Sequence, residues 1–347
     1  MAPWLVSPQT PVTQSVVMCR RTLGDCMSVI LRSVPLELQH RDQHEFAVRD
    51  RRVIVDGINT QYLEAGAGSP LLLLHGYEQS ATSWRWVIPE LARTHRVLAL
   101  SLPGHGDSAP AVGGYAPGRD LAPFVASFLD TLGVGPLDVV GNSVGGAVAL
   151  RLALADPARV RTLTLVASAG LGREVNPLLA LAAQPVLGEL AILLSRVPGG
   201  DLLRTTMSAA MLFAQPWRVP PEFVTEAHAH GCRAGQLEAA TAMARALFDV
   251  NGQREVLLDE LHTLTMPTLV VWGACDYVLP AYQAQSAVDR VPAGRLSLFP
   301  DCGHLPHVEC PDRFATVLGE FLTEHQHPSP VAHHAPALAL ALALVDL

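Results

Sequence analysis

The chain of 347 residues is long enough to form one large domain or two small ones, and either could bury a substantial core. Hydrophobic residues make up 49% and charged residues 16%, a balance typical of globular proteins. The formal net charge of −8, with no long basic run, argues against a nucleic-acid partner. The sequence contains no lysine, which excludes Schiff-base chemistry and a phosphate-binding P-loop.

Cysteine spacing gives no sign of a metal or disulfide framework. The six cysteines are Cys19, Cys26, Cys232, Cys275, Cys302 and Cys310. Because no two of them form a CxxC pair, no zinc site and no disulfide scaffold are expected, and the simplest interpretation is reduced thiols in a cytoplasmic protein. A bridge between Cys275 and Cys302 is left open, since both lie close in sequence to candidate catalytic residues.

The two ends of the chain differ from its middle. Residues 1–45 lack sustained periodicity and are predicted to form a poorly ordered extension, with a targeting segment as an alternative. Residues 326–347 are rich in His, Pro and Ala-Leu repeats, which predicts a disordered tail whose histidines could bind metal only adventitiously. No membrane span is expected, because the most apolar stretch, 178–194, contains Gln, Pro, Gly and Glu. The oligomeric state is not predicted.

From residue 46 the pattern alternates between strands and helices. A hairpin is predicted at 53–63, around the Asp56-Gly57 turn signal. Continuous apolar runs, typical of strands buried on both faces, follow at 71–74, 96–100, 137–140, 162–166 and 268–272, with a last strand at 296–299. Helical patterns lie between them at 81–93, 121–132, 144–155, 283–291 and 313–324. This alternation predicts an α/β fold with a mostly parallel, eight-stranded sheet flanked by helices.

The alternation stops between residues 170 and 261. No convincing strand occurs there, and helical patterns occupy 178–194, 202–213 and 236–247. We therefore expect a helical cap (lid) at 171–260, inserted into a core formed by 46–170 and 261–325.

The strongest chemical signal is the sequence GNSVGG at 141–146. It follows an apolar strand and opens a helical segment, the context that gives the G-x-S-x-G motif its meaning. A turn this tight strains the serine backbone and leaves room only for glycine two residues before and two after it. Ser143 is therefore predicted to present its hydroxyl at a helix N-terminus, where developing negative charge is favoured.

Serine needs a base to become a nucleophile, and His304 is the preferred candidate. It follows the last predicted strand, so its imidazole can reach a serine presented at the same sheet edge. His307 is the rival base, three residues further on. His105, in the sequence PGHGDS, is expected to shape the floor of a loop.

The acid that orients the histidine should follow another strand. Asp276 lies just after the strand predicted at 268–272 and is expected to hold the tautomer of His304. Asp301 and Glu309 are nearer to His304 in sequence, but we interpret them as surface or structural groups. The two backbone N–H donors of an oxyanion hole are expected from Val144 and Tyr77.

Together these motifs resemble the α/β-hydrolase superfamily over about residues 46–322. Within its serine hydrolase branch the chain is similar to esterases, meta-cleavage-product hydrolases and haloperoxidase-like members. The resemblance rests on His75-Gly76, the PGHGDS segment, the elbow around Ser143, the sequence WGACD at 272–276, and Gly303-His304. It implies a triad of Ser143, Asp276 and His304, a mobile lid at 171–260, a small-molecule substrate and no cofactor or metal. The order serine, acid, histidine is that of α/β-hydrolases.

Three functions remain open. The first is hydrolysis of a small ester, thioester or lactone with apolar groups, through an acyl-enzyme on Ser143. The second is C–C bond hydrolysis, because the elbow and the segment 168–172 resemble meta-cleavage-product hydrolases; that family carries Gly-His-Trp where this chain has Gly303-His304-Leu305. A carboxylate substrate of that kind would need a cation, for which the candidates are Arg173, Arg196, Arg204 and Arg218. The third is a slow-turnover, ligand-binding signalling protein of the same fold.

Overall fold

The computed structural model describes residues 47–325, all within one compact unit, His44–Leu347. The predictions for residues 1–45 and 326–347 lie outside the described residues and stay predictions.

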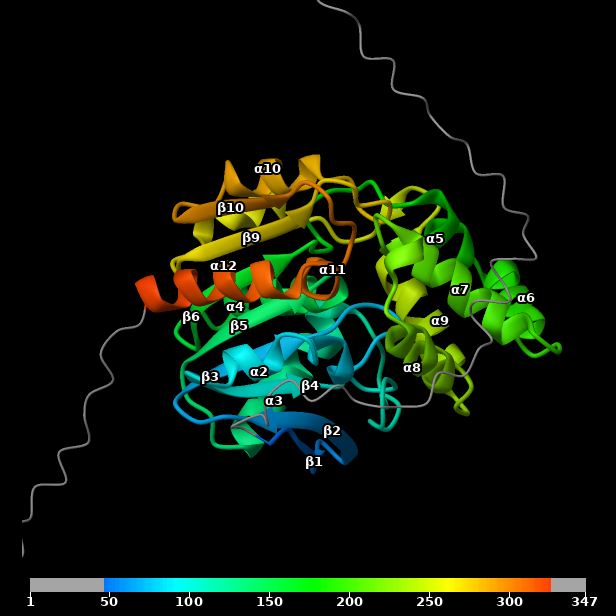
Figure 1. Ribbon diagram of the computed structural model, residues 1–347, viewed down its shortest axis with the longest axis horizontal. Coiled ribbons are helices and arrows are strands. Elements are labelled where there is room, and N and C mark those ends of the chain that lie inside the picture. Colours follow the sequence, from blue (N-terminus) through cyan, green and yellow to red (C-terminus); the bar gives the residue numbers. More distant parts are fainter. Residues whose placement is uncertain (1–46, 326–347) are drawn as a thin grey trace, which may run out of the picture. The chain divides into compact units, whose positions relative to one another are not determined.

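An eight-stranded sheet forms the centre of the fold (Figure 1). Its strands, in spatial order, are β1 (Arg49–Val55), β2 (Ile58–Ala65), β4 (His95–Leu100), β3 (Ser69–Leu74), β5 (Leu137–Asn142), β6 (Val160–Val166), β9 (Thr268–Gly273) and β10 (Gly294–Phe299). β2 pairs antiparallel with both β1 and β4, and every other neighbouring pair is parallel. The predicted mostly parallel sheet of eight strands, including the hairpin at its start, is confirmed.

Helices cover both faces of this sheet, which explains the uninterrupted apolar runs. The flanking helices are α2 (Ile88–Leu91), α3 (Ala122–Thr131), α4 (Val144–Ala155), α10 (Tyr282–Val288), α11 (Pro306–Glu309) and α12 (Pro311–Glu324). Leu72 and Leu74 of β3 belong to the hydrophobic cluster that contains α3 and α4, whereas Leu71 and Leu73 belong to the cluster that contains α12. Alternate side chains of one strand therefore enter different layers, so all of them are apolar.

One predicted helix is wrong in detail. The stretch 81–93 holds a 3₁₀ helix, η1 (Ala81–Trp84), followed by the separate four-residue helix α2. Ser80 caps η1 by accepting a hydrogen bond from the Thr82 amide at 3.3 Å. Pro89 lies in the first turn of α2, where its missing N–H costs nothing, so it starts a second helix instead of continuing the first.

Five α-helices lie in sequence between β6 and β9, and we refer to them as the inserted helices. They are α5 (Pro177–Ala182), α6 (Pro185–Ser195), α7 (Gly200–Leu212), α8 (Pro221–Gly231) and α9 (Gln236–Leu247). Figure 1 shows them grouped at one end of the sheet. The pattern at 178–194 is split into α5 and α6 because Pro185 begins a new helix. Opening and closing of this region as a lid stays a prediction.

Three short helices and one small hairpin complete the described chain. A π-helix, η2 (Pro117–Leu121), precedes α3, and the 3₁₀ helices η3 (Pro216–Arg218) and η4 (Leu258–Thr263) lie before and after α8 and α9. The two-residue strands β7 (Phe248–Asp249) and β8 (Gly252–Gln253) form a hairpin in a stretch where no strand was expected. Four residues in two strands are too few to produce an alternating pattern that can be recognised in sequence.

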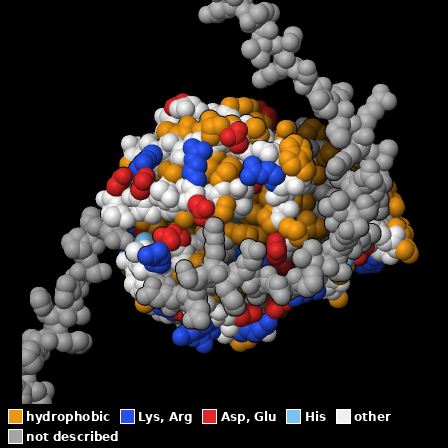
Figure 2. All heavy atoms as spheres, in the orientation of Figure 1, with side chains coloured by type: hydrophobic (Ala, Val, Ile, Leu, Met, Phe, Trp, Pro, Cys, Tyr) orange, Lys and Arg blue, Asp and Glu red, His pale blue; other side chains and the backbone are white. Residues whose placement is uncertain are grey.

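The inserted helices expose more apolar surface than their sequence pattern suggests. Leu178, Leu193 and Leu203 are each more than 60% exposed, and hydrophobic side chains are prominent at the right-hand edge of Figure 2, where these helices lie. Among the helices of residues 47–325, none combines the length and the apolar character needed to cross a bilayer.

Candidate active site

Ser143 occupies a strained turn between β5 and α4. Its backbone has φ 53° and ψ −116°, a left-handed conformation that a residue with a Cβ adopts only when its surroundings hold it there. The Ser143 amide donates to the Val166 carbonyl of β6 at 3.0 Å, which fixes the turn against the neighbouring strand. The serine is 7% exposed and stands at the N-terminus of α4.

Glycines make this turn possible. A Cβ on Gly141 would overlap the carbonyl oxygen of Gly145, and a Cβ on Gly145 would overlap the carbonyl oxygen of Leu74 in β3. On Gly146 it would meet the side chain of Ser168. The predicted steric need for glycine on both sides of the serine is confirmed.

His304 and Asp276 meet at the carboxyl ends of β10 and β9. Nδ1 of His304 lies 2.8 Å from Oδ2 of Asp276, and the two side chains are only 2% and 0% exposed. The other carboxylate oxygen, Oδ1, accepts the amides of Val278 and Leu279 at 2.7 and 3.0 Å. With both oxygens committed, the carboxylate has one orientation, and it directs Nε2 of the imidazole away from the acid.

The loops that carry these two residues pack directly on one another. The Cys275 amide donates to the Cys302 carbonyl at 3.0 Å, and a Cβ on Gly273 would overlap the carbonyl oxygens of Cys302 and Gly303. The close approach therefore requires glycine at the end of β9. Although the loops converge, both Cys275 and Cys302 are free thiols, so the disulfide left open by the sequence does not form here.

Glu309 links the His304 loop to the inserted helices. Its carboxylate accepts the Gly303 amide at 2.7 Å and the Ala214 amide, just beyond α7, at 2.9 Å. The His304 amide in turn donates to the Leu212 carbonyl at 2.8 Å. Burial raises the pKa of Glu309 above its usual value. The sequence marked Glu309 only as a surface or structural group, because nothing local shows that a segment ninety residues earlier returns to it.

His307 does not reach this site. Its ring is fully buried and stacks on Trp84 with centroids 4.1 Å apart, and burial lowers its pKa to about 3. Neither ring nitrogen has a hydrogen-bond partner among the described residues. His307 is absent from the wall of the pocket that Ser143 and His304 share, so the rival base is placed apart from the serine.

The two backbone amides predicted to form an oxyanion hole lie near the serine turn. A Cβ on Gly76 would lie 3.1 Å from the Cβ of Ser143, which shows how closely the loop after β3 approaches the turn. Within residues 47–325 neither the Tyr77 amide nor the Val144 amide donates a hydrogen bond. The structure thus leaves both predicted donors available beside the serine.

Two buried histidines hold the surrounding loops. Nε2 of His75 accepts the Leu102 amide at 2.9 Å, and Nδ1 of His105 is 3.0 Å from the Pro103 carbonyl. Burial lowers the pKa of His75 to about 3 and that of His105 to about 4, so both rings are neutral at pH 7. His105 lines the pocket, in agreement with the expectation that it shapes a loop floor.

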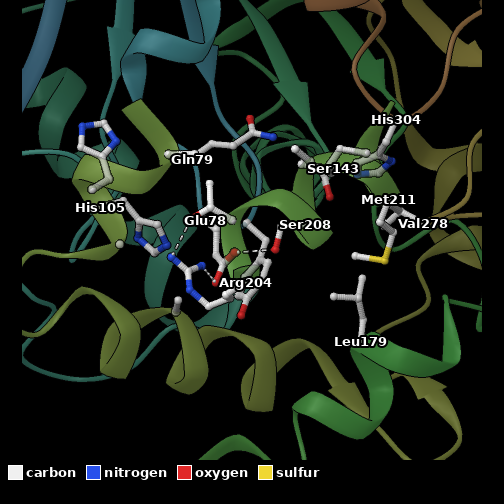
Figure 3. Close-up of a pocket in the computed structure, with 18 of the residues that line it drawn as sticks. Glu78, Gln79, His105, Ser143, Leu179, Arg204, Ser208, Met211, Val278 and His304 are labelled. Carbon is white, nitrogen blue, oxygen red and sulfur yellow. Dashed lines mark hydrogen bonds and ion pairs between the residues drawn. The ribbon is translucent and has the colours of Figure 1, made fainter. Parts of the chain in front are cut away.

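The pocket has an apolar side and a polar side (Figure 3). In this view Leu179, Met211 and Val278 are on the same side of the pocket as Ser143 and His304, while Glu78 and Arg204 are further toward the other side. Nη1 of Arg204 is 2.9 Å from Oε1 of Glu78, whose other oxygen accepts the Ser208 hydroxyl at 3.3 Å. The two charged groups of the polar side are therefore paired with each other.

Of the four arginines predicted as carboxylate-binding candidates, one lines the pocket. Arg204 does so, whereas Arg173, Arg196 and Arg218 are exposed. Arg196 pairs with Glu238 at 2.6 Å on the surface. The sequence around each of these four arginines does not show which one faces the pocket. Only the folded structure shows this.

No hydrogen bond joins the Ser143 hydroxyl to His304 within the described part of the chain, although both face the same pocket. Hydrogen bonds between a catalytic serine and its base often form only when substrate binds. The absence of this bond is therefore compatible with proton transfer from Ser143 to His304. Among the described residues, one group of His, Cys and Asp side chains could share a metal ion, and none of its members lines the pocket.

Comparison with known proteins identifies one family profile and several relatives, each of which covers most of this chain. Residues 71–317 match the profile of the Alpha/beta hydrolase family. The chain is 32% identical over 269 residues to the dihydrolipoyllysine-residue acetyltransferase component of the acetoin cleaving system of Cupriavidus necator, covering 77% of this chain and 67% of that protein. It is also 32% identical to a 2-hydroxymuconate semialdehyde hydrolase of Pseudomonas sp. strain CF600, covering 79% and 94%.

A solved structure agrees with these sequence matches. A serine hydrolase involved in carbazole degradation superposes with a TM-score of 0.66 at 27% identity, covering 80% of this chain and all of that one (100%). With its eight-stranded sheet, its serine turn between β5 and α4, and a family match that spans most of the sheet, the chain belongs to the α/β-hydrolase family.

Proposed function

We propose that the protein is a serine hydrolase that cleaves a small ester, thioester or lactone with apolar groups through an acyl-enzyme on Ser143. The observation that carries this proposal is the 2.8 Å contact between His304 and a doubly anchored Asp276, in the same pocket as a strained Ser143. Family membership supports hydrolysis in general; the ester bond is inferred from the site.

The proposed chemistry follows from the orientation of each group. Because Asp276 accepts the proton at Nδ1, the lone pair of His304 lies on Nε2, which takes the proton of Ser143 as its Oγ attacks the carbonyl carbon. The amides of Val144 and Tyr77 stabilise the oxyanion. His304 then gives the proton to the leaving group, and a water molecule activated in the same way releases the acid and regenerates Ser143.

The charges of the pocket favour an uncharged substrate. Leu179, Met211 and Val278 beside the serine provide an apolar surface for an acyl or alcohol chain. Arg204 is neutralised by Glu78, so the polar side offers hydrogen-bonding groups without a free positive charge. A carboxylate placed there would have to displace Glu78, which costs binding energy.

C–C bond hydrolysis is the second candidate. It is supported by the similarity to the 2-hydroxymuconate semialdehyde hydrolase and by the presence of Arg204 in the pocket wall. The Glu78–Arg204 pair argues against it, and the two candidates differ in whether the pocket accepts an anionic substrate.

The decisive experiment compares the wild type with Ser143→Ala on p-nitrophenyl esters from acetate to palmitate. We expect kcat to fall by about 10⁴–10⁶-fold in Ser143→Ala, as when nucleophiles are removed from other serine hydrolases. Ser127→Ala, in α3 and outside the pocket, is the matched control and should behave as the wild type. Equal activity of Ser143→Ala and the wild type would overturn the nucleophile, and a wild type inert to every ester would overturn the ester assignment.

A further inference from the structure

A cluster of three metal-binding side chain types lies on the inserted helices, outside the pocket. Asp201 is in the first turn of α7, and His228 and Cys232 are four residues apart at the end of α8. The spacing of four places the histidine and the cysteine on the same face of their helix. Asp201 comes from the other helix, so the cluster joins the beginning of α7 to the end of α8.

The distances between the three donor atoms are close to those around a tetrahedral zinc ion. Sγ of Cys232 is 3.3 Å from Oδ2 of Asp201, Nε2 of His228 is 3.6 Å from the same oxygen, and Sγ and Nε2 are 3.8 Å apart. A tetrahedral zinc ion, with bonds of about 2.0 Å to nitrogen or oxygen and about 2.3 Å to sulfur, holds its ligand atoms roughly 3.3–3.6 Å apart. All three separations lie within a few tenths of an ångström of that geometry.

The surroundings suit an ion that enters from solvent. The side chains of His228 and Asp201 are 37% and 34% exposed, and Cys232 is exposed, which leaves an open position for a water ligand. The second oxygen of Asp201 accepts the Leu202 amide at 2.8 Å, so the carboxylate presents Oδ2 to the other two residues. Arg204 is the nearby cation, and its charge is paired with Glu78.

We propose that Asp201, His228 and Cys232 form a binding site for a zinc-like divalent cation that clamps α7 to α8. On binding, the Cys232 thiol releases its proton to solvent and the thiolate, the neutral Nε2 of His228 and the Asp201 carboxylate become ligands. No bond is otherwise broken and no electron is transferred. The proposal is independent of the ester hydrolysis proposed for Ser143.

The clamp would act on the pocket through the two helices it joins. α7 provides Arg204 and Ser208 to the pocket wall, and α8 provides Ala227 and His230. A cation that holds the beginning of α7 against the end of α8 thus stiffens the side of the pocket opposite Ser143. None of its three ligands lines the pocket, so the cation would act through the helices and not on the reacting atoms.

The test measures binding of zinc and cobalt to the full chain after treatment with a chelator. We expect the wild type to bind one equivalent more zinc than Cys232→Ser or His228→Ala, and its cobalt form to show a thiolate-to-cobalt charge-transfer band that both variants lack. Zinc should also raise the melting temperature of the wild type by several degrees and leave that of the variants unchanged. Cys275→Ser and His262→Ala, which change a cysteine and an exposed histidine elsewhere, are the matched controls.

Histidines near the end of the chain can take up zinc without Cys232. The test therefore rests on the difference in bound zinc between the wild type and Cys232→Ser, and not on the total. Equal zinc stoichiometry in the wild type and Cys232→Ser, or a cobalt form without a thiolate band, would overturn the proposal. Melting temperatures of the variants that match the wild type in chelator show that the exposed substitutions leave the fold intact, so that loss of binding reports the site itself.

Discussion

The turn around Ser143 is buried, whereas the inserted helices expose many of their side chains. All residues of β5, the serine and the following helical turn are buried, and each of the glycines at 141, 145 and 146 faces atoms that would overlap a Cβ. The inserted helices, by contrast, expose large apolar side chains such as Leu178 and Leu203. The turn at the end of β5 therefore tolerates very few substitutions. Exposed side chains of the inserted helices, by contrast, can be substituted without moving the helices.

This contrast suggests that the strand ends and the inserted helices have different roles. The side chains proposed to carry the chemistry all follow strands of the sheet. The Ser143 amide is held by β6, whereas the His304 amide donates to Leu212 of α7. Much of the remaining pocket wall, including Arg204 and Met211, comes from the inserted helices. Substitutions at the sheet edge should therefore affect rate or folding, and substitutions in the inserted helices should affect which substrate is accepted.

After Ser143→Ala, the largest effect is expected from Asp276→Asn. An asparagine keeps the shape but cannot stabilise the imidazolium or hold the correct tautomer of His304, so kcat should fall roughly 10³–10⁴-fold with KM little changed. Asp301→Asn, which alters the exposed acid closest in sequence to His304, should stay within about twofold of the wild type. Steady-state kinetics on the best p-nitrophenyl ester measures both, and a larger loss in Asp301→Asn would reassign the acid.

Next in size is the difference between two glycine substitutions in helices. Gly145→Ala places a methyl group on the carbonyl oxygens of Leu74 and His75 and should destabilise the fold by more than about 3 kcal/mol. Gly319→Ala, in α12, has nothing within 4 Å of the added atom and should stabilise the protein by about 0.5–1 kcal/mol. Urea denaturation of both variants checks the comparison, which fails if Gly145→Ala is tolerated.

A smaller effect is expected from Glu78→Gln in the pocket. Removing the negative charge leaves Arg204 without its partner, so an ester that carries a carboxylate should bind about tenfold more tightly, while KM for a neutral ester stays the same. Glu189→Gln removes the partner of Arg245 in the inserted helices, outside the pocket, and is the control. If the wild type already prefers anionic substrates, the C–C hydrolase becomes the better assignment.

The smallest effect is expected at His307. Phenylalanine can keep the stacking on Trp84 and removes two ring nitrogens that have no partner among the described residues, so His307→Phe should stabilise the protein by about 1 kcal/mol at pH 7.5. Its pKa of about 3 in the folded state is below the usual 6.5, so the native state resists protonation.

The sign of the pH dependence follows from that lowered pKa. The stability contributed by neutral His307 is fully present above about pH 6.5 and is lost as the pH falls toward 3. Thermal melts between about pH 7.5 and 4 should therefore show a shallower loss of stability for His307→Phe than for the wild type. His262→Ala, which changes an exposed histidine, should keep the wild-type slope, and identical slopes for all three proteins would contradict the assignment.

Most of the sheet was predictable because its signals are local. A strand buried on both faces is mostly apolar, as at Leu71–Leu74, and a turn as tight as that at Ser143 requires glycine within two residues on either side. The same local logic failed at 81–93, where a proline starts a second helix, and at the two-residue strands β7 and β8. Both features are too short for a periodic pattern.

The sequence by itself determined the fold class, the position of the serine turn and the strand ends from which a base and an acid can reach it. Only the tertiary structure placed His304 against Asp276 and His307 against Trp84, singled out Arg204 among four arginines, and joined Glu309 to Ala214 and Gly303. The physical reason is the range of the interactions. Backbone sterics and burial act between residues close in sequence, whereas hydrogen bonds and ion pairs depend on which distant segments the folded chain brings together.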